Sequence, residues 1–179
     1  DAIDNATVGN YILVKNGTYD GFEVNVDNLT VTGEYLDGVI INDSDSDDSS
    51  GIQQLTIRSN NSLVQNMTIK MDHENDKAVW FTDSSFSRIS KINITSTFSR
   101  AESLKAIQFA TSVNNITIDN VTISIMAYSY VKGDNVTFEN NTFLNTQSFY
   151  IMESQGGPYV FYNNTFKRTS SSPYAQCVC

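Results

Sequence analysis

The sequence contains few of the residues that a metal centre, a nucleic-acid interface or a membrane span requires. Its 179 residues include one histidine, one tryptophan, two prolines and two cysteines. No apolar run approaches the roughly 20 residues of a membrane-spanning helix. Eleven Lys and Arg against 20 Asp and Glu give a formal net charge of −9, which disfavours nucleic acid and anionic membranes. We therefore expect no nucleic-acid partner, no membrane insertion and no cofactor.

The length is typical of one domain that buries its own hydrophobic core. Hydrophobic residues make up 40% of the chain and charged residues only 17%, so Asn, Ser, Thr and Asp supply most of the polarity. Such a surface suits an exported protein better than a cytosolic enzyme. The chain begins with Asp1 and not with Met, which indicates a removed leader or a trimmed chain. We expect an extracellular protein at the cell surface.

Short stretches of alternating apolar and polar residues predict many short β-strands. Examples are "NMTIKM", "NITI", "NVTISI" and "NVTF", each bounded by Asn, Asp, Gly or Ser. In "YVFYNNTF" the same alternation places Val160 and Tyr162 inward. The other residues expected to point into the core are Ile69, Ile94, Ile118, Val121, Ile123, Val136 and Phe138.

The strands belong to a repeat, which predicts an all-β solenoid of about six coils. Asn66, Asn93 and Asn120 follow one another at intervals of 27 residues, and the later "NNTF" copies begin at Asn140 and Asn163. Asn tolerates the left-handed backbone that sharp corners need. Each repeat therefore places Asn at a corner, Thr outward and Ile or Val inward, and stacked Asn amides can bond in ladders.

Several motifs at the start of the chain follow the order of a known family. Gly9, "YILVKNGTY" and "NLTVTGE" resemble the opening of pectate-lyase-like right-handed parallel β-helices. The later "NNITIDNVTI" and "FENNTFLNT" are similar to repeats of that superfamily, especially those of surface and sheath proteins of methanogenic archaea. The resemblance implies a single-stranded right-handed parallel β-helix over residues 1–169, with a short capping helix at residues 2–6. A Ser-rich C-terminal arm, residues 170–179, is expected to follow it.

The Asn-x-Ser/Thr triplets have a second interpretation, because they are also acceptors for N-glycosylation. The solenoid interpretation is favoured for any single site, but some outward-facing sites on an exported chain are expected to carry sugar. The twelve candidates are Asn5, Asn16, Asn28, Asn42, Asn60, Asn66, Asn93, Asn115, Asn120, Asn135, Asn140 and Asn163.

The sequence shows no convincing catalytic site. "AVWFTDSSFS" resembles a pectate lyase segment, but Thr82 and Asp83 stand where that family has its acid and its histidine. The packing residues of the segment are retained as Val79, Trp80 and Phe86. Asp83, Asp119 and Glu139 come from different coils and need not share a face. We therefore expect no catalytic residue and no enzyme.

Two acidic segments are candidate metal sites. His73 lies in "MDHEND", which favours a solvated loop because neighbouring strand residues alternate faces. "NDSDSDDSSG" spaces its acids as an EF-hand does, but Asp48 replaces the turn glycine and Gln54 the bidentate glutamate. An extended acidic loop at residues 43–48 is favoured over weak calcium binding, so no metal site is expected.

The C-terminal region indicates assembly. Some of its aromatic residues must project outward, where a subunit interface is favoured over a sugar platform. Cys177 and Cys179 are too close for an easy internal bridge and suit interchain disulfides. The favoured function is a self-associating structural subunit of an archaeal sheath, surface layer or filament, forming a homopolymer in contact with cell-envelope glycans. The alternatives are a carbohydrate-active β-helix enzyme, lyase or hydrolase, and a carbohydrate-binding adhesin module.

Overall fold

The structure is a computed structural model of the whole chain. The residues that it describes are 2–42, 53–72, 77–96, 104–110, 112–124, 128–131, 133–144, 148–151, 158–167 and 176–178.

Three rows of parallel strands form the three faces of the solenoid. The first row, here called arm A1, consists of β1 (Tyr11–Val14), β4 (Thr30–Gly33), β7 (Leu63–Met71), β9 (Arg88–Ser96), β11 (Asn114–Asp119), β14 (Asp134–Glu139) and β17 (Tyr159–Tyr162). The second row, arm A2, combines the later halves of β7 and β9 with β2 (Gly17–Tyr19), β5 (Val39–Ile41), β12 (Thr122–Ile123), β15 (Thr142–Leu144) and β18 (Thr165–Lys167). Sheet B consists of β3 (Phe22–Val24), β6 (Gln53–Ile57), β8 (Lys77–Phe81), β10 (Lys105–Phe109), β13 (Tyr128–Val131), β16 (Ser148–Ile151) and β19 (Gln176–Val178).

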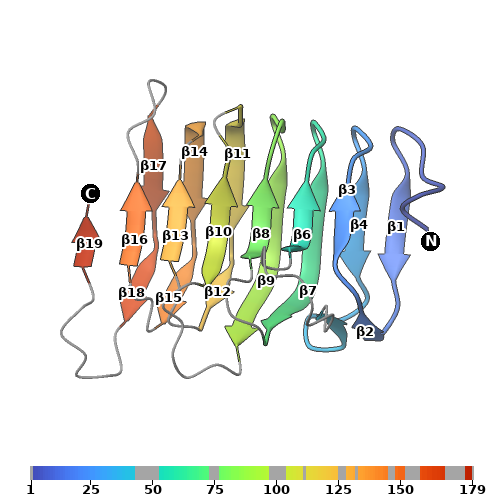
Figure 1. The fold of residues 1–179 in the computed structure, drawn as a ribbon, viewed down its shortest axis with the longest axis horizontal. Coiled ribbons are helices and arrows are strands. Elements are labelled where there is room, and N and C mark those ends of the chain that lie inside the picture. Colours follow the sequence, from blue (N-terminus) through green and yellow to red (C-terminus); the bar gives the residue numbers. More distant parts are fainter. Residues whose placement is uncertain are drawn as a thin grey trace.

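The coils stack along one axis from the N-terminus beside β1 to the C-terminus beside β19 (Figure 1). Each strand pairs in parallel with the equivalent strand of the next coil. This arrangement confirms the right-handed parallel β-helix that the repeats and the family resemblance predicted. Within the described residues, seven strands in arm A1 and seven in sheet B give seven coils, where about six were expected.

The period-2 pattern identified the core correctly over the central coils. The seven central residues expected to point inward are all fully or almost fully buried. The last coil differs, because Val160 and Tyr162 are 46% and 68% exposed. Phe161 instead stacks on the buried Phe138, with ring centroids 5.0 Å apart and an interplanar angle of 2°. The prediction for "YVFY" was therefore shifted by one residue, which in a strand reverses every side chain.

Asparagine turns the corners, as predicted. Eleven described residues other than glycine have a left-handed backbone, and seven of them are sequon asparagines. These seven are Asn28, Asn66, Asn115, Asn120, Asn135, Asn140 and Asn163.

The 27-residue spacing was a misleading guide to register. Asn93 lies within β9, where it pairs with Thr68 of β7 and with Thr122 of β12. Lys91 takes the corner of that coil, with a φ of 51°. Asn66 therefore stacks over Lys91 and not over Asn93.

Side-chain amides form the expected ladders at the C-terminal coils. The buried Asn141 donates through Nδ2 to Oδ1 of Asn164 at 3.0 Å and to the carbonyl oxygen of Ile118 at 2.9 Å. On the outer side of the same corner, Asn163 donates through Nδ2 to Oδ1 of Asn140 at 2.9 Å. The ladders satisfy amide groups that would otherwise be buried without partners.

The two ends depart from the expected boundaries. Residues 2–6 form a turn, closed by a hydrogen bond of 3.0 Å from the Ala6 N–H to the Ile3 carbonyl, where a capping helix was expected. At the other end, β19 pairs with β16, so the backbone of Cys177 lies in sheet B beside Phe149. The part of the expected C-terminal arm that the structure describes is thus a strand. The described residues include no helix long and apolar enough to span a membrane.

Adjacent residues of β12 provide a matched test of the coil architecture. Ile123 is fully buried, whereas Thr122 points outward and is partly exposed. Ile123→Asp should prevent folding because it buries an unpaired carboxylate in the stack. Thr122→Asp should change the unfolding free energy by less than about 1 kcal/mol. Circular dichroism and urea unfolding of both variants check this, and equal stability of the two would contradict the register of β12.

Candidate functional site

The outer face of arm A1 carries columns of aligned side chains, because its strands pair in register. Asp119 of β11 aligns with Glu139 of β14 and with Ser90 of β9. Two residues earlier along β11, Thr117 aligns with Arg88. Side chains from three successive coils therefore meet on one surface.

An arginine joins two carboxylates of neighbouring coils on this face. Nη2 of Arg88 donates to Oδ2 of Asp119 at 2.5 Å and to Oε1 of Glu139 at 3.5 Å. The Arg88 side chain is 47% exposed, and those of Asp119 and Glu139 are 13% and 31% exposed. The three charged groups are therefore held together but can still be reached from solvent.

Asp119 accepts hydrogen bonds from two further side chains in addition to Arg88. The donors are Ser90 Oγ at 2.9 Å and Asn140 Nδ2 at 3.2 Å. Burial raises the pKa of Asp119, but the hydrogen bonds from Arg88, Asn140 and Ser90 and the charge of Arg88 lower it by more. The pKa of Asp119 is therefore below its ordinary value, and the carboxylate stays ionised at neutral pH.

A groove of about 570 Å³ lies beside this cluster on the same face. Its floor is formed by Thr117 and Thr137, which pair with each other across β11 and β14. Amide and hydroxyl groups with apolar side chains line it, and none of the described lining residues carries a charge. The lining residues are Phe86, Asn115, Thr117, Asn135, Thr137, Pro158 and Val160.

The three acids named from the sequence do not behave alike. Asp119 and Glu139 share a face and an arginine, although their origin in different coils did not require it. Asp83 lies elsewhere, in the corner between β8 and β9, where it accepts a hydrogen bond from Ser112 Oγ at 2.7 Å. Its neighbour Thr82 is nearly buried, so this segment has no site corresponding to the lyase acid and histidine.

The packing role assigned to "AVWFTDSSFS" is correct for Val79 and wrong for Phe86. Val79 is fully buried, whereas Phe86 is 62% exposed. Trp80 is partly exposed, with Lys77 Nζ 5.4 Å from the centre of its ring.

Several residues named from the sequence lie outside the described parts of the chain. These are His73, the acidic loop at 43–48, the side chain of Cys177, and Cys179. The interchain disulfide therefore stays a prediction, and the choice between an extended acidic loop and weak calcium binding stays open. Among the described residues, no three His, Cys, Asp or Glu side chains are grouped as a metal site would require.

Glycosylation also stays a prediction, although the structure distinguishes among the candidates. The amide nitrogen of Asn66 donates to the carbonyl oxygen of Gly33 at 2.7 Å and is partly buried. That of Asn93 donates to Asp37 at 3.3 Å. Asn120 and Asn135, by contrast, are exposed corner residues.

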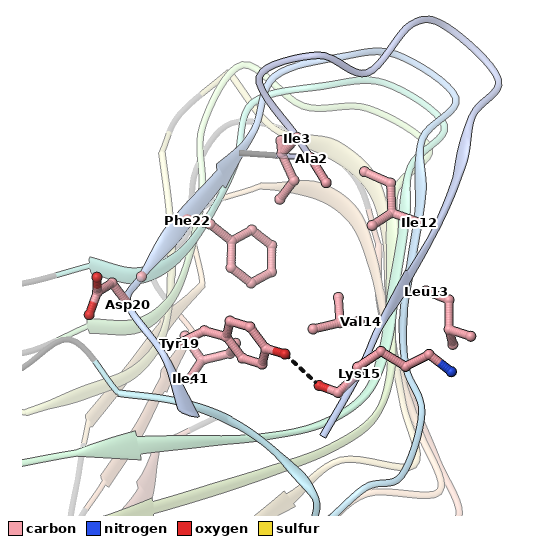
Figure 2. Close-up of a pocket in the computed structure, with 11 residues that line it drawn as sticks. Ala2, Ile3, Ile12, Leu13, Val14, Lys15, Tyr19, Asp20, Phe22 and Ile41 are labelled. Carbon is pink, nitrogen blue, oxygen red and sulfur yellow. Dashed lines mark hydrogen bonds between the residues drawn. The ribbon is translucent and has the colours of Figure 1, made fainter. Parts of the chain in front are cut away.

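A second pocket, of about 540 Å³, opens at the N-terminal end of the solenoid. Figure 2 shows Ile12, Val14 and Phe22 pointing into it, and the Tyr19 hydroxyl donating to the Lys15 carbonyl oxygen at 2.8 Å. The pocket is an extension of the apolar core. Of its described lining residues only Lys15 and Asp20 are charged, and Lys15 Nζ pairs with Glu34 at 2.9 Å. It therefore lacks the reactive groups of the arm A1 face.

Comparison with known proteins identifies the fold of this chain. The chain matches no protein-family profile, and no curated protein is similar to it in sequence. Solved structures do match. An alginate lyase from Paenibacillus sp. str. FPU-7 superposes with a TM-score of 0.62 at 15% identity, over 92% of this chain and 72% of the lyase.

Two other solved structures have the same architecture. The PL6-family alginate lyase AlyGC gives a TM-score of 0.68 at 15% identity, over 92% of this chain and 26% of that one. A pectin methylesterase in complex with a hexasaccharide gives 0.60 at 16% identity, over 95% and 61%. At these identities the likeness establishes the parallel β-helix fold and nothing finer.

These neighbours correct the interpretation of function. They are polysaccharide lyases and pectin methylesterases, and they point to the carbohydrate-active alternative. The expectation of an archaeal structural subunit without enzymatic activity is therefore wrong. The resemblance to archaeal sheath proteins also gains no support, whereas that to the pectate-lyase-like superfamily is supported at the level of the fold.

The lowered pKa of Asp119 predicts a pH dependence of stability. Its folded pKa lies below the unfolded value of about 3.9, so its stabilising contribution is complete above about pH 5. The contribution is lost as the pH falls through the folded pKa. Wild type should therefore be more stable than Asp119→Asn at pH 7, and the difference should shrink in acid. Urea unfolding between pH 7 and pH 2.5 measures it.

Arg88→Gln is the matched control, because it removes the cation that lowers this pKa. In the Arg88→Gln background, Asp119→Asn should have a smaller effect at neutral pH. A difference between wild type and Asp119→Asn that stays constant over the whole pH range would contradict the assignment.

Proposed function

We propose that this protein is a carbohydrate-active enzyme that hydrolyses a polysaccharide bound along the outer face of arm A1. The observation that carries the proposal is the contact of one guanidinium nitrogen with two carboxylates from adjacent coils, Asp119 and Glu139. The β-helix neighbours that act on alginate and pectin support the class of substrate.

The two carboxyl groups have unlike surroundings, as acid–base chemistry requires. Asp119 accepts three hydrogen bonds and stays ionised, which suits a nucleophile or a base that activates water. Glu139 is more exposed and has the weaker contact with Arg88. In the proposed reaction Asp119 takes a proton from the attacking water, and the protonated form of Glu139 gives its proton to the leaving oxygen. Arg88 holds the two acids in place, and both recover their protonation states by exchange with water after the product leaves.

Hydrolysis is favoured over elimination by the charge of the site. Elimination from a uronic-acid polymer needs a cation against the sugar carboxylate and a base for the carbon-bound proton. Among the described residues of the cluster and groove, the cation is Arg88, which is already paired with two acids. Two carboxylates suffice for the cleavage of a glycosidic bond by water.

An extracellular location is consistent with a polysaccharide substrate and stays part of the proposal. A carbohydrate-binding module is the second candidate. The uncharged groove of about 570 Å³ beside the cluster supports it, since binding would need the groove but not the acids.

Substitution of the two acids tests the proposal. Asp119→Asn and Glu139→Gln should each lower the rate of polysaccharide cleavage by about 100-fold or more. Release of reducing ends and of unsaturated products is measured on alginate, on polygalacturonate, on its methyl-esterified form, and on neutral xylan and galactomannan. Reducing ends without unsaturated product are expected.

Glu23→Gln is the matched control, because Glu23 forms a comparable ion pair outside arm A1. Its Oε1 lies 3.6 Å from Nη1 of Arg58, and Glu23 belongs to β3 of sheet B. It should leave the cleavage rate unchanged. Wild-type protein that cleaves none of these polymers but binds one would favour the binding module. Cleavage that survives both acid substitutions would remove Asp119 and Glu139 from the chemistry.

A further inference from the structure

Phe86 is an unusual residue at the edge of the groove. Its side chain is 62% exposed, and its backbone is left-handed, with a φ of 57°. A bulky side chain rarely adopts this conformation, which costs free energy outside glycine, Asn and Asp. An exposed aromatic ring gains little from burial that could offset this cost.

The equivalent turn of a neighbouring coil shows which residue stands at this position where no function is assigned to it. Residues 59–62, "SNNS", and residues 84–87, "SSFS", occupy equivalent corners. In both turns the two outer serines are hydrogen-bonded to each other, at 2.8 Å in the first and 3.1 Å in the second. Asn61 occupies the position equivalent to Phe86 and has nearly the same φ, 54°.

Three other central coils have the same residue type at that corner. Asn28, Asn115 and Asn135 take the left-handed position there, whereas Gly9 and Pro158 stand at the equivalent position in the first and last coils. Phe86 thus lies between asparagines of the neighbouring coils, and its ring lies at the groove. The fold gives no reason for an aromatic residue at this place.

The groove has the chemistry of a site for an uncharged sugar. Amides of Asn115 and Asn135 and hydroxyls of Thr117 and Thr137 can bond to sugar hydroxyls. An aromatic face packs against the C–H groups of a pyranose ring. The charge cluster beside the groove contains two acids and one arginine, and the chain carries a net charge of −9, so a polyanion is repelled.

We propose that the groove is a saccharide subsite in which Phe86 stacks on a sugar without a free carboxylate. The subsite rests on the proposed function for its location beside Asp119 and Glu139, and it adds the class of sugar and the residue that selects it. Phe86 is a binding residue here and takes no part in bond cleavage.

Phe86→Asn tests this directly, since the fold already accepts Asn at the equivalent position 61. The variant should unfold at the same temperature as wild type or at a higher one. Its affinity for the preferred neutral polymer should fall about tenfold or more. Affinity gel electrophoresis in xylan, galactomannan, methyl-esterified polygalacturonate, its de-esterified product and alginate measures the affinity.

Three further variants are the controls. Phe86→Trp should retain binding, because the aromatic face is kept. Tyr35→Asn removes an aromatic residue of similar exposure, 63%, outside the groove and should leave binding unchanged. Asn61→Phe should lower stability without increasing affinity.

The measurements are made in the Asp119→Asn background to prevent turnover, which also separates this proposal from the proposed function. If binding depends on Phe86 but wild type cleaves no polymer, the saccharide subsite is supported and the proposed enzymatic function is contradicted. The subsite would be overturned by cleavage that does not depend on Phe86, or by equal binding of Phe86→Asn and wild type. It would also be overturned by the absence of binding to any neutral polymer, or by stronger binding of the de-esterified polymer.

Discussion

Parallel stacking in register is the constraint on which the rest of this structure depends. Each strand pairs with the equivalent strand of the next coil, so a residue type required at one place is required again one coil further on. Inward positions take aliphatic and aromatic side chains, and corners take asparagine because the backbone there is left-handed. The buried Asn141 and the partly buried Asn164 repeat the same contact in successive coils, since each amide donates a hydrogen bond to a backbone carbonyl of the preceding coil.

The same stacking creates an outer surface on which functional side chains can be recognised, because they differ from the residues at equivalent positions of other coils. Where the stack has no folding requirement, outward side chains of successive coils are free to differ, and their separation is fixed by the strand spacing. Arg88, Asp119 and Glu139 come from three coils and are brought into contact only by this register. The charge cluster and the uncharged groove lie side by side on arm A1, which is the basis for placing both cleavage and binding there.

The alternation of apolar residues and the positions of Asn predicted the strands, the core and the corners. The features that the sequence did not predict depend on the register between coils. Alternation located Ile118 and Phe138 in the core, and Asn preference located the corners, because both depend on neighbours in sequence. The coils differ in length, so equal spacing of Asn66 and Asn93 did not mean equal position in the stack. With the register undetermined, Asp119 and Glu139 could not be recognised as partners. Phe86 was taken for a packing residue, since its exposure depends on the turn around it.

The most direct measurement of the central claim is an NMR titration of the Asp119→Asn protein with a methyl-esterified oligogalacturonide. If arm A1 carries the sugar, the amide signals that move should cluster on β9, β11 and β14, around Arg88, Thr117 and Thr137. The outer face of sheet B around Glu23 and Arg58 and the pocket at Ile12 and Phe22 should stay unchanged. Shifts centred on either of those regions, or none on arm A1 at saturating oligosaccharide, would contradict the account.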